Sequence, residues 1–275
     1  MRRGVYAVSE KIKLYGFNNL TKTLSFNIYD VCYAKTEREK EDYIKYIDEQ
    51  YNSERLTKIL CDVTETIGAH VLNISRQDYE PQGASVNILI TEEALPIANI
   101  DPSCNKGELS YVDLRDSIVG HLDKSHLTVH TYPEFHPNND IISFRVDIDV
   151  STCGMISPLN ALDYLINSFD SDVITMDYRV RGFTRDVDGR KCYIDHEMKT
   201  IQDFIDDDIL KRYDAMDVNM YQSNIFHTKM MVKDIKLDNY LFNSDPYELS
   251  PHDRRDIRDR LTKEMIEIYC GVNVY

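Results

Sequence analysis

One run near the middle of the chain strongly restricts its fold. From residue 142 to residue 151, apolar and polar side chains alternate without a break. The apolar members are Ile142, Phe144, Val146, Ile148 and Val150. A period of two puts them on one face of a β-strand and the polar side chains on the other. The run therefore predicts a strand with one face on the core and one polar face.

The same alternation assigns a side to a cysteine. Continued past Ser151, it places Cys153 on the polar face of the strand, and Gly154 then ends the strand. A free intracellular cysteine is most often a small buried hydrophobe. The position of Cys153 instead makes its thiol a candidate for chemistry.

Other patterns predict strands and helices around this run. Thr36 and Glu39 have the spacing of a capping box, which opens a helix to about residue 51. Further helices are predicted over 53–67 with Ser53 as the cap, from Ser157-Pro158 onward, over 200–213, and from Ser250-Pro251 to Gly271. Strands are predicted over 24–33, 70–75, 84–90, 127–132, 173–183 and 191–195, with 219–232 ambiguous. Hairpins between paired strands favour an α+β class with an antiparallel sheet.

Composition limits the class of protein. The 275 residues show no shift in composition that marks a domain boundary, so we expect one domain over 1–275. The net charge of −15 argues against nucleic acid as a partner, because phosphates would be repelled. No apolar run is long enough to cross a membrane, and no signal peptide is evident, so a cytoplasmic location is expected.

Reactive side chains gather between residues 121 and 134. These fourteen residues hold one serine, three histidines, one lysine and two carboxylates, and from 127 to 132 they read as a strand that Pro133 ends. A zinc site is disfavoured, because His126 and His130 would lie about 13 Å apart on a strand. Ser125 is in no G-x-S-x-G elbow. A pair of Cys153 with His130 stays open, since spacing alone cannot bring them together.

Several motifs in fixed order resemble the S-adenosylmethionine decarboxylase family, in its longer bacterial branch. They are Lys124-Ser125-His126, 130–134 (His-Thr-Tyr-Pro-Glu), 80–84 (Glu-Pro-Gln-Gly-Ala) and 151–154 (Ser-Thr-Cys-Gly). The similarity continues through 14–20, 178–185 and 224–229 and so covers nearly the whole chain. The departures are a slightly long amino end and a variable loop near 95–115, and neither touches a motif.

The resemblance implies a proenzyme that cuts itself between Lys124 and Ser125. The fragments would be a beta chain, 1–124, and an alpha chain, 125–275. Ser125 would attack the carbonyl of Lys124 and end as a pyruvoyl group, which forms a Schiff base with the substrate. His130 matches the proton acceptor of this processing, because a neutral imidazole can take a proton near pH 7.

The resemblance also implies the reaction and its other residues. The activity would be that of a carboxy-lyase that decarboxylates S-adenosylmethionine for spermidine biosynthesis. Cys153 matches the proton donor in catalysis, and Glu134 a carboxylate that binds the substrate's ribose. Ser117 matches a serine that assists the site. Glu80 lies in a turn, 77–83, that is more polar than a turn needs, so it is a candidate for substrate binding; an ordinary hairpin loop is the alternative.

The family's fold is an α/β sandwich with antiparallel sheet, and its members self-associate. For the longer branch a heterooctamer of four alpha and four beta chains is expected, with Mg²⁺ as an activator. Two rival interpretations remain. One is a pyruvoyl-dependent decarboxylase of a basic amino acid such as arginine or ornithine. The other is an uncleaved binding paralogue, which is disfavoured because Ser125, His130 and Cys153 are all present.

Overall fold

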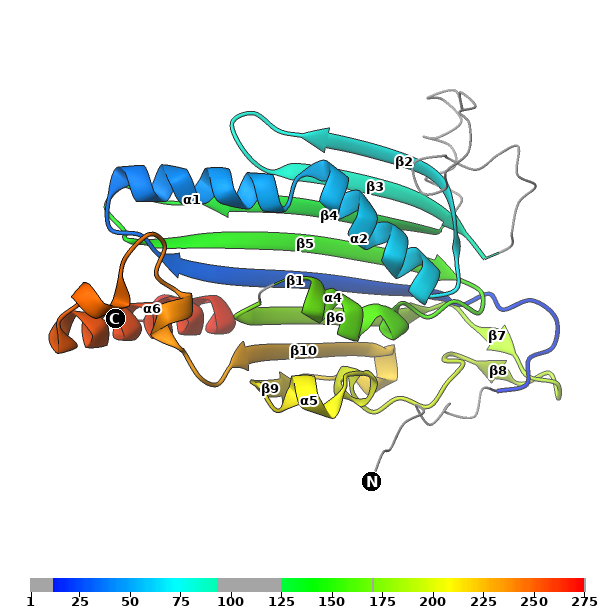
Figure 1. Cartoon of the computed structure of the whole chain (residues 1–275). Coiled ribbons are helices and arrows are strands. Elements are labelled where there is room, and N and C mark those ends of the chain that lie inside the picture. Colours follow the sequence, from blue (N-terminus) through cyan, green and yellow to red (C-terminus); the bar gives the residue numbers. More distant parts are fainter. Residues whose placement is uncertain (1–11, 93–124, 170, 275) are drawn as a thin grey trace.

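A computed structural model describes residues 12–92, 125–169 and 171–274 of the chain. Within them, eight strands form one antiparallel sheet in the order β2-β3-β4-β5-β1-β6-β10-β9 (Figure 1). Their bounds are β1 Thr21–Tyr33, β2 His70–Asp78, β3 Ala84–Thr91, β4 Ser125–Glu134, β5 Ile141–Cys153, β6 Val173–Arg181, β9 Tyr213–Asp217 and β10 Ile225–Val232. A second, two-stranded sheet pairs β7 (Thr184–Arg185) with β8 (Lys191–Cys192). The predicted α+β class with an antiparallel sheet is confirmed.

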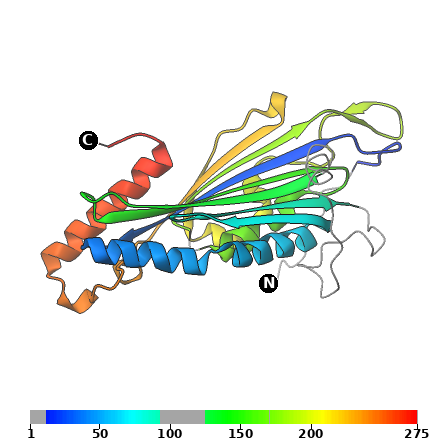
Figure 2. The ribbon, with the colours of Figure 1, turned by 90° about the horizontal axis from the view of Figure 1, so that it is seen from above.

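Helices cover one face of the large sheet. They are α1 (Glu37–Gln50), α2 (Ser53–Thr66), α4 (Leu162–Ser168) and the short α5 (Asp207–Leu210), and Figure 2 shows α1 and α2 lying along that face. The apolar set of β5 points toward them, with Ile142, Val146 and Ile148 all buried. The main core therefore lies between this face and the helices, as the alternation predicts.

The long C-terminal helix α6 (Pro251–Cys270) covers one end of the opposite face. Its Ile257, Leu261 and Met265 pack with Val31 and Val173 in a second apolar cluster. Further along this face the side chains are polar, and Asp149 and Asp177 are exposed. No helix in the described part of the chain combines the length and apolar character that crossing a bilayer requires.

The order of the strands interleaves the two ends of the chain. β1 lies between β5 and β6, although more than a hundred residues separate it from either in sequence. Strands from before and after Ser125 therefore share one continuous hydrogen-bonded sheet.

Several predicted details differ from the structure. Residues 200–213 form no continuous helix but a 3₁₀ turn (Ile201–Phe204), α5 and the start of β9. Asn52 rather than Ser53 caps α2, through a hydrogen bond from Arg55 N to Asn52 Oδ1. The strand predicted to end before Pro133 runs on to Glu134. The variable loop near 95–115 lies outside the described residues.

The capping box at the start of α1 is present as predicted. Glu39 N donates to Thr36 Oγ1 at 3.2 Å, and Thr36 N donates to Glu39 Oε2 at 2.7 Å. We expect Thr36→Ala to lower the free energy of unfolding by about 1 kcal/mol, because an N-terminal amide of the helix loses its partner. Urea denaturation measures this loss. Thr66→Ala is the control, since the Thr66 hydroxyl only bonds back to Asp62 O within α2; equal losses in the two variants would contradict the assignment.

Candidate functional site

Ser125 and Cys153 meet at one end of the large sheet, on two of its inner strands. Ser125 is the first residue of β4, Cys153 is the last of β5, and the two strands pair with His126 opposite Ser151. Antiparallel pairing in this register brings the start of one strand beside the end of the other. The two side chains, 28 positions apart in sequence, are therefore close in space.

The contact between these two residues is direct. Ser125 Oγ lies 3.4 Å from Cys153 Sγ, and Cys153 N donates a hydrogen bond to Ser125 Oγ at 3.2 Å. Ser125 is 8% exposed, whereas Cys153 is exposed, as its predicted place on the polar face requires. The arrangement holds a mostly buried hydroxyl against a thiol that solvent or a ligand can reach.

The turn after Cys153 is tightly packed against Glu92. Gly154 has φ +72°, and a Cβ there would lie 2.2 Å from Glu92 Oε2. Glu92 Oε1 also accepts a hydrogen bond from Met155 N at 3.2 Å. Any side chain at position 154 would be strained by its backbone and would displace this carboxylate. Glu92 is a neighbour of the site that the sequence motifs did not indicate.

A buried ion pair lies behind the same turn. Lys22 Nζ is 2.6 Å from Asp195 Oδ2, and the two side chains are 1% and 9% exposed. Burial raises the pKa of the Asp195 carboxyl, but hydrogen bonds from His196, Lys22 and Asn18 outweigh it and hold that pKa well below its usual range. A signal for Lys22 does exist in the sequence, because it shares the parity of the core residues Leu24 and Phe26 in β1.

His130 does not lie beside Ser125 within one chain. It is five residues further along β4, about 16 Å away at ~3.3 Å per residue. It sits opposite Asp147 of β5 on the polar face, half-buried, with its ring 6.3 Å from that of Tyr132.

Glu134 and Glu80 lie at the other end of the sheet. Glu134 is nine residues from Ser125, about 30 Å along the strand, and accepts a hydrogen bond from Ser143 Oγ at 2.7 Å. Glu80 is exposed in the turn between β2 and β3. Ser117 and Lys124 lie outside the described residues. The structure thus brings Ser125 together with Cys153 and leaves the other described candidates apart from them.

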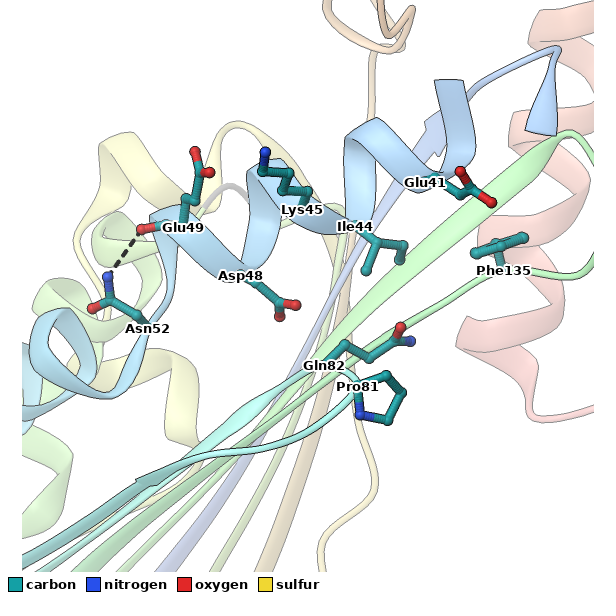
Figure 3. A pocket seen from close by; sticks show the side chains of 9 residues that line it. All are labelled: Glu41, Ile44, Lys45, Asp48, Glu49, Asn52, Pro81, Gln82 and Phe135. Atoms are coloured by element: carbon teal, nitrogen blue, oxygen red, sulfur yellow. Dashed lines mark hydrogen bonds between the residues drawn. The ribbon is translucent and has the colours of Figure 1, made fainter. Parts of the chain in front are cut away.

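A pocket on the helical side of the sheet is separate from the Ser125–Cys153 pair. Figure 3 shows it between α1 and the β2–β3 turn. Its lining residues are Glu41, Ile44, Lys45, Asp48, Glu49, Asn52, Pro81, Gln82 and Phe135. Gly83 N donates to Asp48 Oδ1 at 2.9 Å, and burial raises the pKa of the Asp48 carboxyl. The lining contains no serine, cysteine or histidine.

The Mg²⁺ expected from the resemblance has no evident ligands in residues 12–92, 125–169 and 171–274. No three His, Cys, Asp or Glu side chains there gather closely enough to hold an ion.

The described residues form an α+β fold with one large antiparallel sheet, and at one end of that sheet a serine hydroxyl and an exposed thiol are in contact. The family model described as S-adenosylmethionine decarboxylase matches residues 42–182 of the chain. The chain belongs to the S-adenosylmethionine decarboxylase family, as the sequence motifs predict.

Similar proteins from three bacteria cover almost the full chain, and each is named S-adenosylmethionine decarboxylase proenzyme. The one from Clostridium perfringens strain SM101 is 88% identical over 98% of this chain and 99% of its own length. Those from Alkaliphilus oremlandii and Hahella chejuensis are 74% and 60% identical over 98% and 97% of this chain, and 99% of their own lengths. The solved adenosylmethionine decarboxylase of Aquifex aeolicus is 16% identical, covers 66% of this chain and 99% of its own, and has a TM-score of 0.33.

Proposed function

We propose that this chain is a proenzyme that cuts itself between Lys124 and Ser125 and then decarboxylates S-adenosylmethionine. The products are S-adenosylmethioninamine and CO2, and the former supplies aminopropyl groups for spermidine biosynthesis. The observation that carries the proposal is the contact of Ser125 Oγ with the Cys153 thiol and amide. Membership of the family and the names of the close relatives support it.

The cut requires the hydroxyl of Ser125. Its oxygen attacks the carbonyl carbon of Lys124, and the amide becomes an ester as the nitrogen of residue 125 is released from that carbonyl. Removal of the α-proton of residue 125 then expels the 1–124 carboxylate and leaves a dehydroalanine. Water hydrolyses this to a ketone and ammonia, so residue 125 becomes a pyruvoyl group at the start of the 125–275 fragment.

The residues around Ser125 fit such a group. The hydroxyl from which it forms is already in contact with a thiol and a backbone N–H. Once formed, the pyruvoyl group supplies a ketone that binds the substrate's amine covalently and withdraws electrons as CO2 leaves. Cys153 then gives a proton to the substrate's α-carbon, and its exposed thiol lies within reach of residue 125.

The processing base comes from a second copy of the chain in this proposal. A base must reach the α-proton of residue 125, and His130 of the same chain lies about 16 Å away along β4. His130 and Glu134 instead share the polar face of the sheet, which a second copy can approach. Self-association thus completes the site. We propose that the cleaved protein forms the expected assembly of four alpha and four beta chains.

Mixing two inactive variants tests this sharing. Ser125→Ala and His130→Ala chains should each remain uncleaved when made alone. Made together, the His130→Ala chains should be cut, since they keep Ser125 and receive an intact His130 from the partner copy. Denaturing electrophoresis with differently tagged chains measures this.

His136→Ala is the control for the mixing experiment, because His136 is exposed and lies past the end of β4. That variant should cut itself without help. If the mixed His130→Ala chains stay intact, the base does not come from His130 of another copy.

Substrate labelled in its carboxyl group tests the activity itself. We expect the purified protein to release labelled CO2 from S-adenosylmethionine and none from arginine or ornithine. Release of labelled CO2 from arginine or ornithine but not from S-adenosylmethionine would show that the protein is the rival decarboxylase of a basic amino acid. A preparation that stays as one 275-residue chain and releases no CO2 would favour the uncleaved binding paralogue.

A further inference from the structure

The turn that follows Cys153 is fixed by one buried ammonium group. Lys22 Nζ donates to Gly154 O at 3.0 Å and to Ile156 O at 3.2 Å. Its remaining partner is Asp195 Oδ2 at 2.6 Å. An ammonium has three N–H donors, and each one has an acceptor here. Lys22 therefore has no donor left for a substrate, and its contacts are all with the chain itself.

Asn18 strengthens the same arrangement. Its Nδ2 donates to Gly154 O at 2.9 Å and to Asp195 Oδ2 at 2.8 Å. Asn18 is 4% exposed and Lys22 1% exposed. The carbonyl directly after Cys153 thus accepts from two buried side chains, both of which are tied to one carboxylate. His196 Nδ1 lies 2.8 Å from the other oxygen of that carboxylate and holds it in place.

The turn is held from its other side as well. Glu92 accepts from Met155 N there, while Thr21 pairs with Cys153 in the β1–β5 ladder. An ion pair this deeply buried is weak evidence for stability, because desolvation opposes its formation. Its contacts suggest another role, since the acceptors other than Asp195 are the carbonyls of the turn that begins at Cys153.

We propose that Lys22, fixed by Asp195 and Asn18, is a positioning residue that holds the turn after Cys153 and so aims the thiol at residue 125. The inference rests on the proposed role of Cys153 as proton donor. A misplaced thiol has two consequences. Turnover slows, because a displacement of about 1 Å in a reacting group can cost 10²-fold in rate. The proton is also delivered to the wrong carbon more often.

Protonation at the wrong carbon converts residue 125 irreversibly to another residue. After CO2 has left, the electron pair would be shared between the substrate's α-carbon and the former α-carbon of residue 125. A proton on the carbon of residue 125, followed by hydrolysis, leaves alanine at the start of the 125–275 fragment and releases the substrate portion as an aldehyde. A fragment that begins with alanine has a free amine and can be sequenced from its amino terminus. A fragment that begins with a pyruvoyl group has no amine there, so its amino terminus is blocked to sequencing.

The test compares Lys22→Met with Lys40→Met. Lys40 is also 1% exposed, but it bonds to Pro137 O and pairs with Asp140 far from Cys153. Both variants should still cut themselves, because strand pairing keeps Cys153 N at Ser125. Lys22→Met should lose about 10²-fold in kcat, with a smaller change in KM, and should accumulate the alanine start during turnover. Lys40→Met should keep the wild-type kcat and a blocked start.

Two further variants test the same proposal if Lys22→Met does not fold. Lys22→Met with Asp195→Leu removes both charges and avoids an unpaired buried carboxylate. Asn18→Ala removes one of the two donors to Gly154 O and keeps the ion pair. Each should show the same two effects, with Asn18→Ala the milder.

If the folded variants keep wild-type kcat and a blocked start, the inference is wrong. A wild-type protein that never cuts itself would instead overturn the proposed function, so the two failures are distinguishable.

Discussion

Ser125→Ala is expected to abolish both the cut and the decarboxylation. Alanine has no oxygen to attack the carbonyl of Lys124, so the backbone stays intact and no ketone forms. The variant should fold, because Ser125 contributes a small side chain at the end of an inner strand and, within the described residues, its hydroxyl contacts Cys153 alone. Denaturing electrophoresis and CO2 release measure the two losses.

Ser168→Ala serves as the control for this prediction. The hydroxyl of Ser168 bonds only to Tyr164 O of its own helix, α4, so its loss should leave the cut complete. Appearance of the 125–275 fragment in Ser125→Ala would show that another residue starts the reaction, and the mechanism proposed above would fail.

Cys153→Ala should separate the cut from the turnover. The hydrogen bond to Ser125 Oγ comes from the backbone N of residue 153, and it survives the substitution. Cleavage should therefore proceed. Removal of the thiol deletes the proton donor, and kcat should fall by about 10²- to 10⁴-fold, the range typical of a general acid.

The outcome is read by electrophoresis for the fragments and by CO2 release for kcat, with Cys270→Ala as the control. Cys270 is an exposed thiol at the end of α6, and its loss should change neither quantity. Wild-type turnover in Cys153→Ala would exclude the thiol as donor. Loss of cleavage with an intact fold would move Cys153 from turnover to processing.

The sequence predicts the parts of this fold that local patterns control. The alternation of 142–151 gives β5 and the polar-face side of Cys153, and the Thr36–Glu39 spacing gives the start of α1. Pro133 misleads because a proline normally interrupts a ladder. In the described structure β3 pairs with β4 only as far as His130, so the strand beyond is an edge where a missing N–H is tolerated.

The candidate site also contains residues that sequence patterns predict and residues that they do not. Ser125 and Cys153 carry motifs, and their register brings them together as the family resemblance implies. The pair of Lys22 with Asp195 links residues 173 positions apart, so no local pattern could indicate it. His130 shows a different limit, because the motif that contains it does not indicate that it lies about 16 Å from Ser125 within one chain.

Under the proposed cut, the place of β1 in the sheet would make unfolding of the mature protein hard to reverse. An unfolded proenzyme can refold as a single polypeptide, since β1 is tethered to its neighbours β5 and β6. After the cut, the same refolding needs two separate molecules to meet, so its rate depends on concentration. The lifetime of the cut protein would then be set by its barrier to unfolding rather than by an equilibrium.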